Sequence, residues 1–163
     1  MTRTHPRDRD ITGTAYYEYR HVVDIADTGT TGTVHDVSYG RWQSRCREMF
    51  LFEHLPALLD EIKTGLIKFT VLDYGQVIFT GIRALDEVFV RMRVDKLALT
   101  EIGFVFDHLR LCQGIPELAA RGWQRVACKQ RAGLDSHPAP LPEQLRLALS
   151  DYVINPHSVT TSH

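Results

Sequence analysis

Residues 27–51 read DTGTTGTVHDVSYGRWQSRCREMFL, and this stretch decides the fold. It contains Gly29 and Gly32, which can adopt backbone angles that other residues avoid, so its first part predicts a tight turn. Over 37–53 apolar residues recur every three or four positions, which is typical of a helix with a wide apolar face. The members of that face are Tyr39, Trp42, Cys46, Met49 and Phe50. We therefore predict a glycine turn that leads directly into a long helix lying on a sheet.

The junction between the turn and the helix is the first candidate site. The first N–H groups of a helix have no acceptor within it, so they favour an anion or a developing oxyanion in front of the helix. His35 and Asp36 offer an imidazole and a carboxylate for acid–base chemistry, although adjacent side chains point in different directions. The structural interpretations are that Asp36 caps the helix and that Asp27 accepts from free backbone N–H groups of the turn.

The rest of the chain has mainly the two-residue period of β-strands. A strand over 16–25 precedes the turn, and a short helix over 57–64, opened by Pro56 and closed by Gly65, follows the long one. Further strands are predicted over 66–72 and 76–84, as one long strand or two, and over 87–94, 100–111 and 118–130. Short turns favour antiparallel pairing. The pattern predicts an α+β fold in which one long helix packs on a curled antiparallel sheet.

The composition is typical of a soluble globular domain. The 163 residues are 44% hydrophobic and 24% charged, with a formal net charge of -1. That charge gives no bulk attraction to nucleic acid or to an anionic membrane, and the absence of a long apolar run predicts no membrane span. The first ten residues are charged and do not resemble a secretory signal.

The cysteines and histidines predict neither a disulfide framework nor a metal site. Cys46, Cys112 and Cys128 are odd in number and far apart, which favours a reducing cytoplasm. We expect Cys46 to be packed in the core rather than to act as a nucleophile. The eight histidines show no metal-ligand spacing, so no metal is expected.

The order of these elements and the residues within them resemble the hotdog-fold thioesterases. More narrowly, they resemble the 4-hydroxybenzoyl-CoA thioesterase-like enzymes that act beside enediyne polyketide synthases. The most specific matching segment is WQSRCRE at 42–48, whereas the frame of Asp27-Thr28, Gly32 and Tyr39 is a general hotdog pattern. Other matching segments are YEYRHVV at 17–23, LIKFTV at 66–71, VRMR at 90–93 and GWQRVAC at 122–128.

The resemblance covers about residues 15–150, and the composition along the chain predicts three segments. These are a flexible N-terminus over 1–14, a hotdog domain over 15–131 and a proline-rich tail over 132–163. Within the tail we expect a short helix at 143–152, followed by disorder.

The resemblance also implies a function. Such enzymes hydrolyse a thioester and release a polyene or β-keto polyketide chain from the phosphopantetheine arm of an acyl carrier protein, with no cofactor of their own. They are cytoplasmic dimers or tetramers with active sites between subunits. An exposed sheet edge is a liability, which agrees with pairing between copies.

The family pattern assigns catalytic roles to Arg47 and Tyr39. The guanidinium fork of Arg47 is suited to hold a carbonyl or a carboxylate, and Tyr39 would bind the substrate or shape its channel. The residues expected to bind the substrate are Gly29, Gly32, Thr33, Val34, His35 and Thr70. A basic rim for an acidic carrier protein would comprise Arg41, Arg45, Arg91 and Arg93.

This chain departs from its relatives at Gly29, where many carry Asp and the enediyne group carries Asn. Backbone N–H groups at the helix start would then form the oxyanion hole, where one donor contributes roughly 3 kcal/mol. Gly29 also leaves open a hotdog protein that binds the polyketide without hydrolysing it. An acyl dehydratase is a third hypothesis, for which only His35 with Asp36 could provide the base and the acid.

Overall fold

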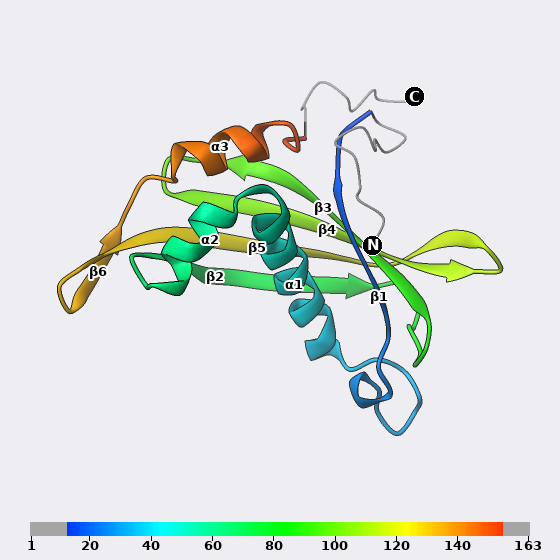
Figure 1. Cartoon of the computed structure of the whole chain (residues 1–163). Coiled ribbons are helices and arrows are strands. Elements are labelled where there is room, and N and C mark those ends of the chain that lie inside the picture. Colours follow the sequence, from blue (N-terminus) through cyan, green and yellow to red (C-terminus); the bar gives the residue numbers. More distant parts are fainter. Residues whose placement is uncertain (1–12, 155–163) are drawn as a thin grey trace.

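In the computed structural model, which describes residues 13–154, six strands form one antiparallel sheet that curls around helix α1 (Figure 1). The strand order is β1-β3-β4-β5-β2, and β6 pairs with β5 beside this path. The elements are β1 Tyr17–Val22, the 3-10 helix η1 Ile25–Asp27, α1 Asp36–His54, α2 Pro56–Lys63, β2 Ile67–Ile78, β3 Glu87–Leu97, β4 Glu101–Cys112, β5 Ile115–Ala132, β6 Asp135–Pro138 and α3 Glu143–Ser150. This arrangement confirms the predicted α+β hotdog fold.

Helix α1 buries the face that its apolar period predicts. Tyr39, Trp42, Cys46, Met49 and Phe50 are all buried against the sheet. Burying a side chain of this size contributes about 1.5–3 kcal/mol, so this face holds the helix on the sheet. Cys46 is completely buried and its thiol donates to the Val90 carbonyl at 3.8 Å. Burial raises the pKa of the Cys46 thiol, which confirms its expected packing role.

Two elements were not predicted, and the strand before the turn is shorter than expected. The chain leaves β1 at Val22 because Asp24 starts η1, its carboxylate accepting from the Ala26 N–H at 3.0 Å. Strand β6 forms where the tail turns back at Gly133, whose φ of +65° favours glycine. Both elements depend on local turns or on pairing with β5 rather than on hydrophobic period.

Strand β2 resolves the question of one strand or two. It is a single strand whose pairing with β5 shifts between Val71 and Asp73, which indicates a β-bulge. Helix α3 lies within the segment where a tail helix was expected, and Leu145 and Leu149 join the core. The flexibility predicted for 1–14 and the disorder predicted after the tail helix fall mostly on residues outside 13–154; of the first fourteen residues, Gly13 and Thr14 are described, and Thr14 is buried.

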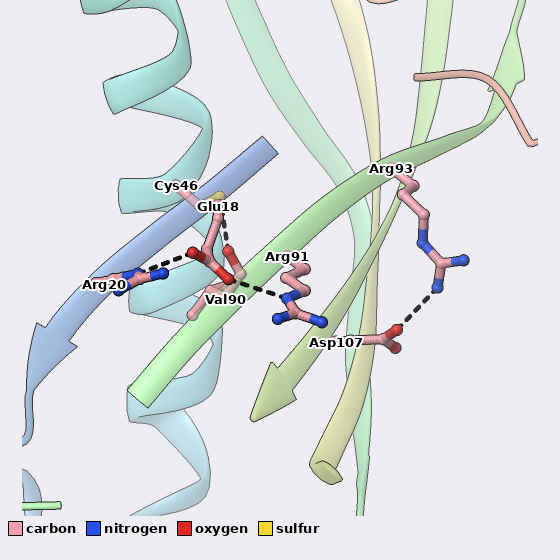
Figure 2. Close-up of polar contacts among 7 residues, drawn as sticks. All are labelled: Glu18, Arg20, Cys46, Val90, Arg91, Arg93 and Asp107. Atoms are coloured by element: carbon pink, nitrogen blue, oxygen red, sulfur yellow. Dashed lines mark hydrogen bonds and ion pairs between the residues drawn. The ribbon is translucent and has the colours of Figure 1, made fainter. Parts of the chain in front are cut away.

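The outer face of the sheet, opposite α1, carries a network of ion pairs (Figure 2). Glu18 is buried and accepts from Arg20 at 2.8 Å and from Arg91 at 3.0 Å. Beside them, Asp107 accepts from Arg93 at 2.8 Å and from Arg121 at 2.8 Å. The guanidiniums of Arg20 and Arg91 also lie over aromatic rings, at 4.6 and 4.5 Å from the ring centres. These arginines tie β1, β3, β4 and β5 together.

A polar layer lies between α1 and the inner face of the sheet. The side-chain amide nitrogen of Gln43 lies 3.1 Å from Nε2 of the completely buried His108. Gly122 leaves room for Gln43, since a Cβ there would clash with that amide. Burial lowers the pKa of His108 to about 3 and that of His21 to about 4, and the neighbouring His21 adds to the effect on His108. Both imidazoles are therefore neutral near pH 7.

Within residues 13–154 no helix is long and apolar enough to span a bilayer.

Candidate active site

The loop before α1 is a small hairpin, as the two glycines predict. Thr28 and Val34 form a β-bridge, and the Gly29 N–H donates to the Thr33 carbonyl at 2.9 Å. The Gly32 N–H donates to the Gly29 carbonyl at 3.0 Å, with Gly32 at a φ of +75°. Only glycine adopts that conformation without strain, so Gly32 sets the path of the loop.

Asp27 fastens this loop to the first two turns of α1. Its carboxylate accepts from the Ser38 hydroxyl at 3.2 Å and forms an ion pair with Arg41. The His35 N–H donates to the Asp27 carbonyl at 2.9 Å. The expectation that the Asp27 side chain caps free backbone N–H groups is therefore wrong, because Ser38 and Arg41 occupy the carboxylate.

His35, and not Asp36, is the N-cap of α1, and it makes no side-chain cap hydrogen bond. Asp36 is the first helical residue, where a carboxylate is favoured by the positive end of the helix. The prediction of an Asp36 cap is wrong by one position, because Ser38 N–H already bonds the His35 carbonyl at 3.0 Å. Among the described residues no hydrogen bond joins His35 to Asp36, so the acid–base pair that a dehydratase would need is not assembled.

The ring of His35 lies where a side chain at position 29 would begin. A Cβ on Gly29 would lie 2.9 Å from Cε1 of His35, closer than side chains normally approach. A side chain at position 29 therefore requires His35 to move. A shallow hollow at this loop brings together four expected substrate-binding residues, namely Gly29, Thr33, Val34 and His35.

An apolar cavity of about 870 Å³ lies farther along α1, between this helix, α2, α3 and the sheet. Its walls are mainly aromatic and aliphatic and include Phe50, Phe69, Met92, Phe104, Leu145 and Leu149. Its volume falls in the range of pockets that bury a small organic ligand. The charged residues Arg45, Glu48, Lys63 and Lys68 also border the cavity.

Arg47 brings a cation into this apolar cavity. Its Nη2 donates to the Ser44 hydroxyl at 3.5 Å, and its Cζ lies 6.0 Å from the Phe104 ring centre. Nε is buried without a hydrogen-bond partner, and within residues 13–154 no carboxylate forms an ion pair with Arg47. Burial lowers the pKa of Arg47, and Glu48 partly opposes this, but a guanidinium keeps its charge in proteins. The Arg47 guanidinium thus lines the cavity without an ion-pair partner among residues 13–154.

Tyr39 and Thr70 lie away from the cavity. Tyr39 is buried in the core, edge-on to Trp42 and His108, where burial raises the pKa of its hydroxyl. Thr70 follows Phe69 on β2, and neighbouring strand residues face opposite sides of a sheet. Since Phe69 lines the cavity, Thr70 points toward the outer face. Sequence reasoning missed Phe69, although its place in the matching segment LIKFTV was a usable signal.

The arginines expected to form a basic rim do not share one surface. Arg41 and Arg45 project from α1, where they pair with Asp27 and Glu48. Arg91 and Arg93 lie on the outer face of the sheet, paired as described above. The predicted rim is therefore divided between two faces, and each of its members already has a carboxylate partner.

The loop hollow and the cavity are separate within one chain. The start of α1 and Arg47 are eleven residues apart, which is roughly 16 Å along a helix axis. No single substrate carbonyl can contact both the helix start and the Arg47 guanidinium of the same chain.

The chain is similar to known thioesterases. No family model matches the sequence, and a search of curated proteins finds no match. Among solved structures, the dynemicin thioesterase, crystallised in a study of polyene binding, shares 37% identity and a TM-score of 0.81, over 86% of this chain and 99% of that one. The 4-hydroxybenzoyl-CoA thioesterase shares the fold at 12% identity, with a TM-score of 0.74 over 83% and 99% of the two chains. The 1,4-dihydroxy-2-naphthoyl-CoA thioesterase from Synechocystis does so at 19%, with a TM-score of 0.69 over 83% and 96%.

The curled sheet, the single central helix and these similarities define a hotdog-fold thioester hydrolase. Within that class, the chain belongs to the thioesterases of the enediyne polyketide synthase-associated type.

Proposed function

We propose that the enzyme hydrolyses the thioester between a polyene or β-keto polyketide chain and the phosphopantetheine arm of an acyl carrier protein. The observation that carries this proposal is the unpaired Arg47 guanidinium in a large apolar cavity. A long unsaturated chain is suited to the aromatic and aliphatic walls, and a β-keto or carboxylate oxygen is suited to the guanidinium. The dynemicin thioesterase, which was studied with bound polyene, supports the same substrate class.

The reaction consumes one water molecule. Water attacks the carbonyl carbon, the carbon–sulfur bond breaks, and the thiol leaves with a proton while the acyl group becomes a carboxylic acid. Thioesters are activated, so a strong base at position 29 is not essential to this step. The N–H groups at the start of α1 would stabilise the oxyanion, and Arg47 would orient the acyl chain through a fixed fork of donors.

We further propose that two copies of the chain assemble each site. Strand β2 is an edge of the sheet, and it exposes Val71, Leu72, Tyr74 and Val77. An exposed apolar edge strand favours pairing with another chain. Antiparallel pairing of two β2 edges would bring the start of α1 in one copy toward the Arg47 cavity of the other, which resolves their separation within one chain. This assembly agrees with the dimers or tetramers expected from the family.

The direct experiment loads an acyl carrier domain of an enediyne polyketide synthase with a polyene thioester and follows the products by mass spectrometry. We expect the free acid, or the methyl ketone formed when a β-keto acid loses carbon dioxide. A reaction containing enzyme inactivated by heat gives the uncatalysed rate. Binding of the loaded carrier without release would contradict the proposal and favour a non-hydrolytic role.

A further inference from the structure

Strand β5 carries three positive side chains that form no ion pair with any residue of 13–154. On β5, Arg125, Lys129 and Arg131 occupy alternate positions, while Val126 and Cys128 between them are buried under α1. Alternation places the three cations on the outer face. Lys68 of β2 is the direct pairing neighbour of Lys129 and faces the same side. We define these four residues, Lys68, Arg125, Lys129 and Arg131, as the basic stripe.

The basic stripe differs from the other charged groups of the outer face. Within residues 13–154 none of its members forms an ion pair, although Asp73 is the strand neighbour of Arg125. Within the described part of the chain, the Arg131 side chain donates one hydrogen bond, from Nε to the Gly133 carbonyl at 3.2 Å. By contrast, Arg93 and Arg121 on the same face are both bound to Asp107. Like charges directly opposite each other on neighbouring strands are destabilising. The charges of Lys68 and Lys129 therefore do not stabilise the fold.

The basic stripe adjoins the Arg47 cavity. Lys68 itself borders the cavity, and the next residue, Phe69, lines its wall. Gly65, which also borders the cavity, lies near Arg131, since a Cβ there would be 4.0 Å from Nη1. In Figure 1 the start of β2, the end of β5 and α2 gather at one end of the molecule. A partner bound to the stripe would therefore lie next to residues that line the Arg47 cavity.

We infer that the basic stripe is the docking surface for the acidic acyl carrier domain that delivers the substrate. This inference rests on the proposed function and replaces the divided rim of arginines expected from the sequence. An acidic partner complements the charge of the stripe, and its tethered arm suits the adjacent cavity. Charges at the rim of an interface mainly accelerate encounter and set the salt dependence of binding, and their field is screened within about 8 Å at physiological salt.

The test measures binding and turnover separately. A fluorescein-labelled acyl carrier domain of an enediyne polyketide synthase, in its phosphopantetheinylated form, is titrated with enzyme and followed by anisotropy at low and at physiological salt. Arg131→Glu should weaken binding about fivefold at low salt, and Lys129→Glu combined with Arg131→Glu at least about tenfold, with a smaller salt dependence. The matched control is Arg83→Glu, an exposed arginine in the turn before β3, which should bind as the wild type does.

The same variants are assayed with a small N-acetylcysteamine thioester, which needs no carrier, and we expect unchanged kcat/KM. Equal carrier binding by all variants, or no binding by the wild type, would overturn the inference. So would a parallel loss of small-thioester turnover, since the stripe would then act on the site or the fold. A change of oligomeric mass with carrier binding intact would identify an interface between copies instead. If the carrier binds through the stripe but no acid is released from the loaded carrier, the proposed function fails while the docking surface stands.

Discussion

The arginines of this protein occupy two contrasting environments. On the outer face of the sheet, Arg91 and Arg93 are each held by a buried or half-buried carboxylate (Figure 2). In the cavity, the polar contacts of the Arg47 side chain with residues 13–154 are a long hydrogen bond to Ser44 and a distant aromatic ring. Removing a charge from water is costly unless a partner compensates. The paired Arg91 and Arg93 therefore stabilise the fold. Arg47 lowers the stability of the free protein, and a bound anionic or carbonyl ligand can offset that loss.

The largest expected effect is that of Arg47→Ala on turnover. Loss of the guanidinium that orients the acyl chain misplaces the thioester and lowers kcat by about 10²-fold. The free energy of unfolding should stay the same or rise, because the variant removes an unpaired cation from an apolar cavity. Steady-state release of thiol and thermal unfolding measure the two quantities. Arg47→Lys keeps the positive charge but lacks the planar guanidinium donors, so it should restore only part of the wild-type rate. A fully restored rate would exclude bidentate binding by Arg47.

The opposite pattern is expected for Glu18→Ala. Removing this carboxylate leaves Arg20 and Arg91 without their shared acceptor and lowers the free energy of unfolding by about 2 kcal/mol. Turnover per folded molecule should not change. Urea unfolding measures the loss, and Lys96→Gln is the control, since its pair with Glu101 is long and exposed and contributes less than about 0.5 kcal/mol. A large loss of turnover in folded Glu18→Ala would show that the outer network acts on catalysis.

A pH titration tests the neutral polar layer beneath α1. His21 and His108 have folded pKa values of about 4 and about 3, whereas an unfolded histidine has a pKa near 6.5. Below that value the unfolded chain binds protons that the folded chain does not. The free energy of unfolding is therefore highest above pH 6.5 and decreases as the pH falls toward the folded pKa. We expect a loss of about 1.6 kcal/mol per histidine between pH 6.5 and 5. In His108→Leu the loss of unfolding free energy over that pH interval should be smaller by the contribution of one histidine. The unfolding free energy at pH 7 also falls in this variant, because Gln43 loses its hydrogen-bond partner. An unchanged pH slope would contradict the assignment.

The smallest effect is expected at Gly29. The three described atoms nearest to a Cβ there belong to the exposed His35 ring, which can rotate, so Gly29→Ala should reduce stability by less than about 1 kcal/mol. Combining it with His35→Ala should abolish that cost, which a double-mutant cycle detects. Gly32→Ala is the contrasting control, because its positive φ strains any other residue whether or not His35 is present. Additive effects of Gly29→Ala and His35→Ala would show that the ring does not occupy this space.

The sequence predicted those features that depend on period. The face of α1, five of the six strands and the burial of Cys46 follow from apolar spacing. Tyr39 and Arg47 are eight residues apart, so they were expected on one broad side without contact, and the structure places one in the core and the other in the cavity. Side-chain partners were not predictable, because they depend on which strands become neighbours. Thus Asp27 pairs with Arg41, and β6 exists only because β5 extends far enough to pair with it.

The central claim is that the unpaired Arg47, and not a paired arginine, holds the substrate. Calorimetric titration of a long-chain polyene carboxylate into wild-type enzyme, Arg47→Met and Arg93→Met tests it most directly. We predict that Arg47→Met weakens binding at least tenfold, about 1.4 kcal/mol, while Arg93→Met binds normally and unfolds at a lower temperature. Equal affinities for the wild type and Arg47→Met, or a loss confined to Arg93→Met, would contradict the claim.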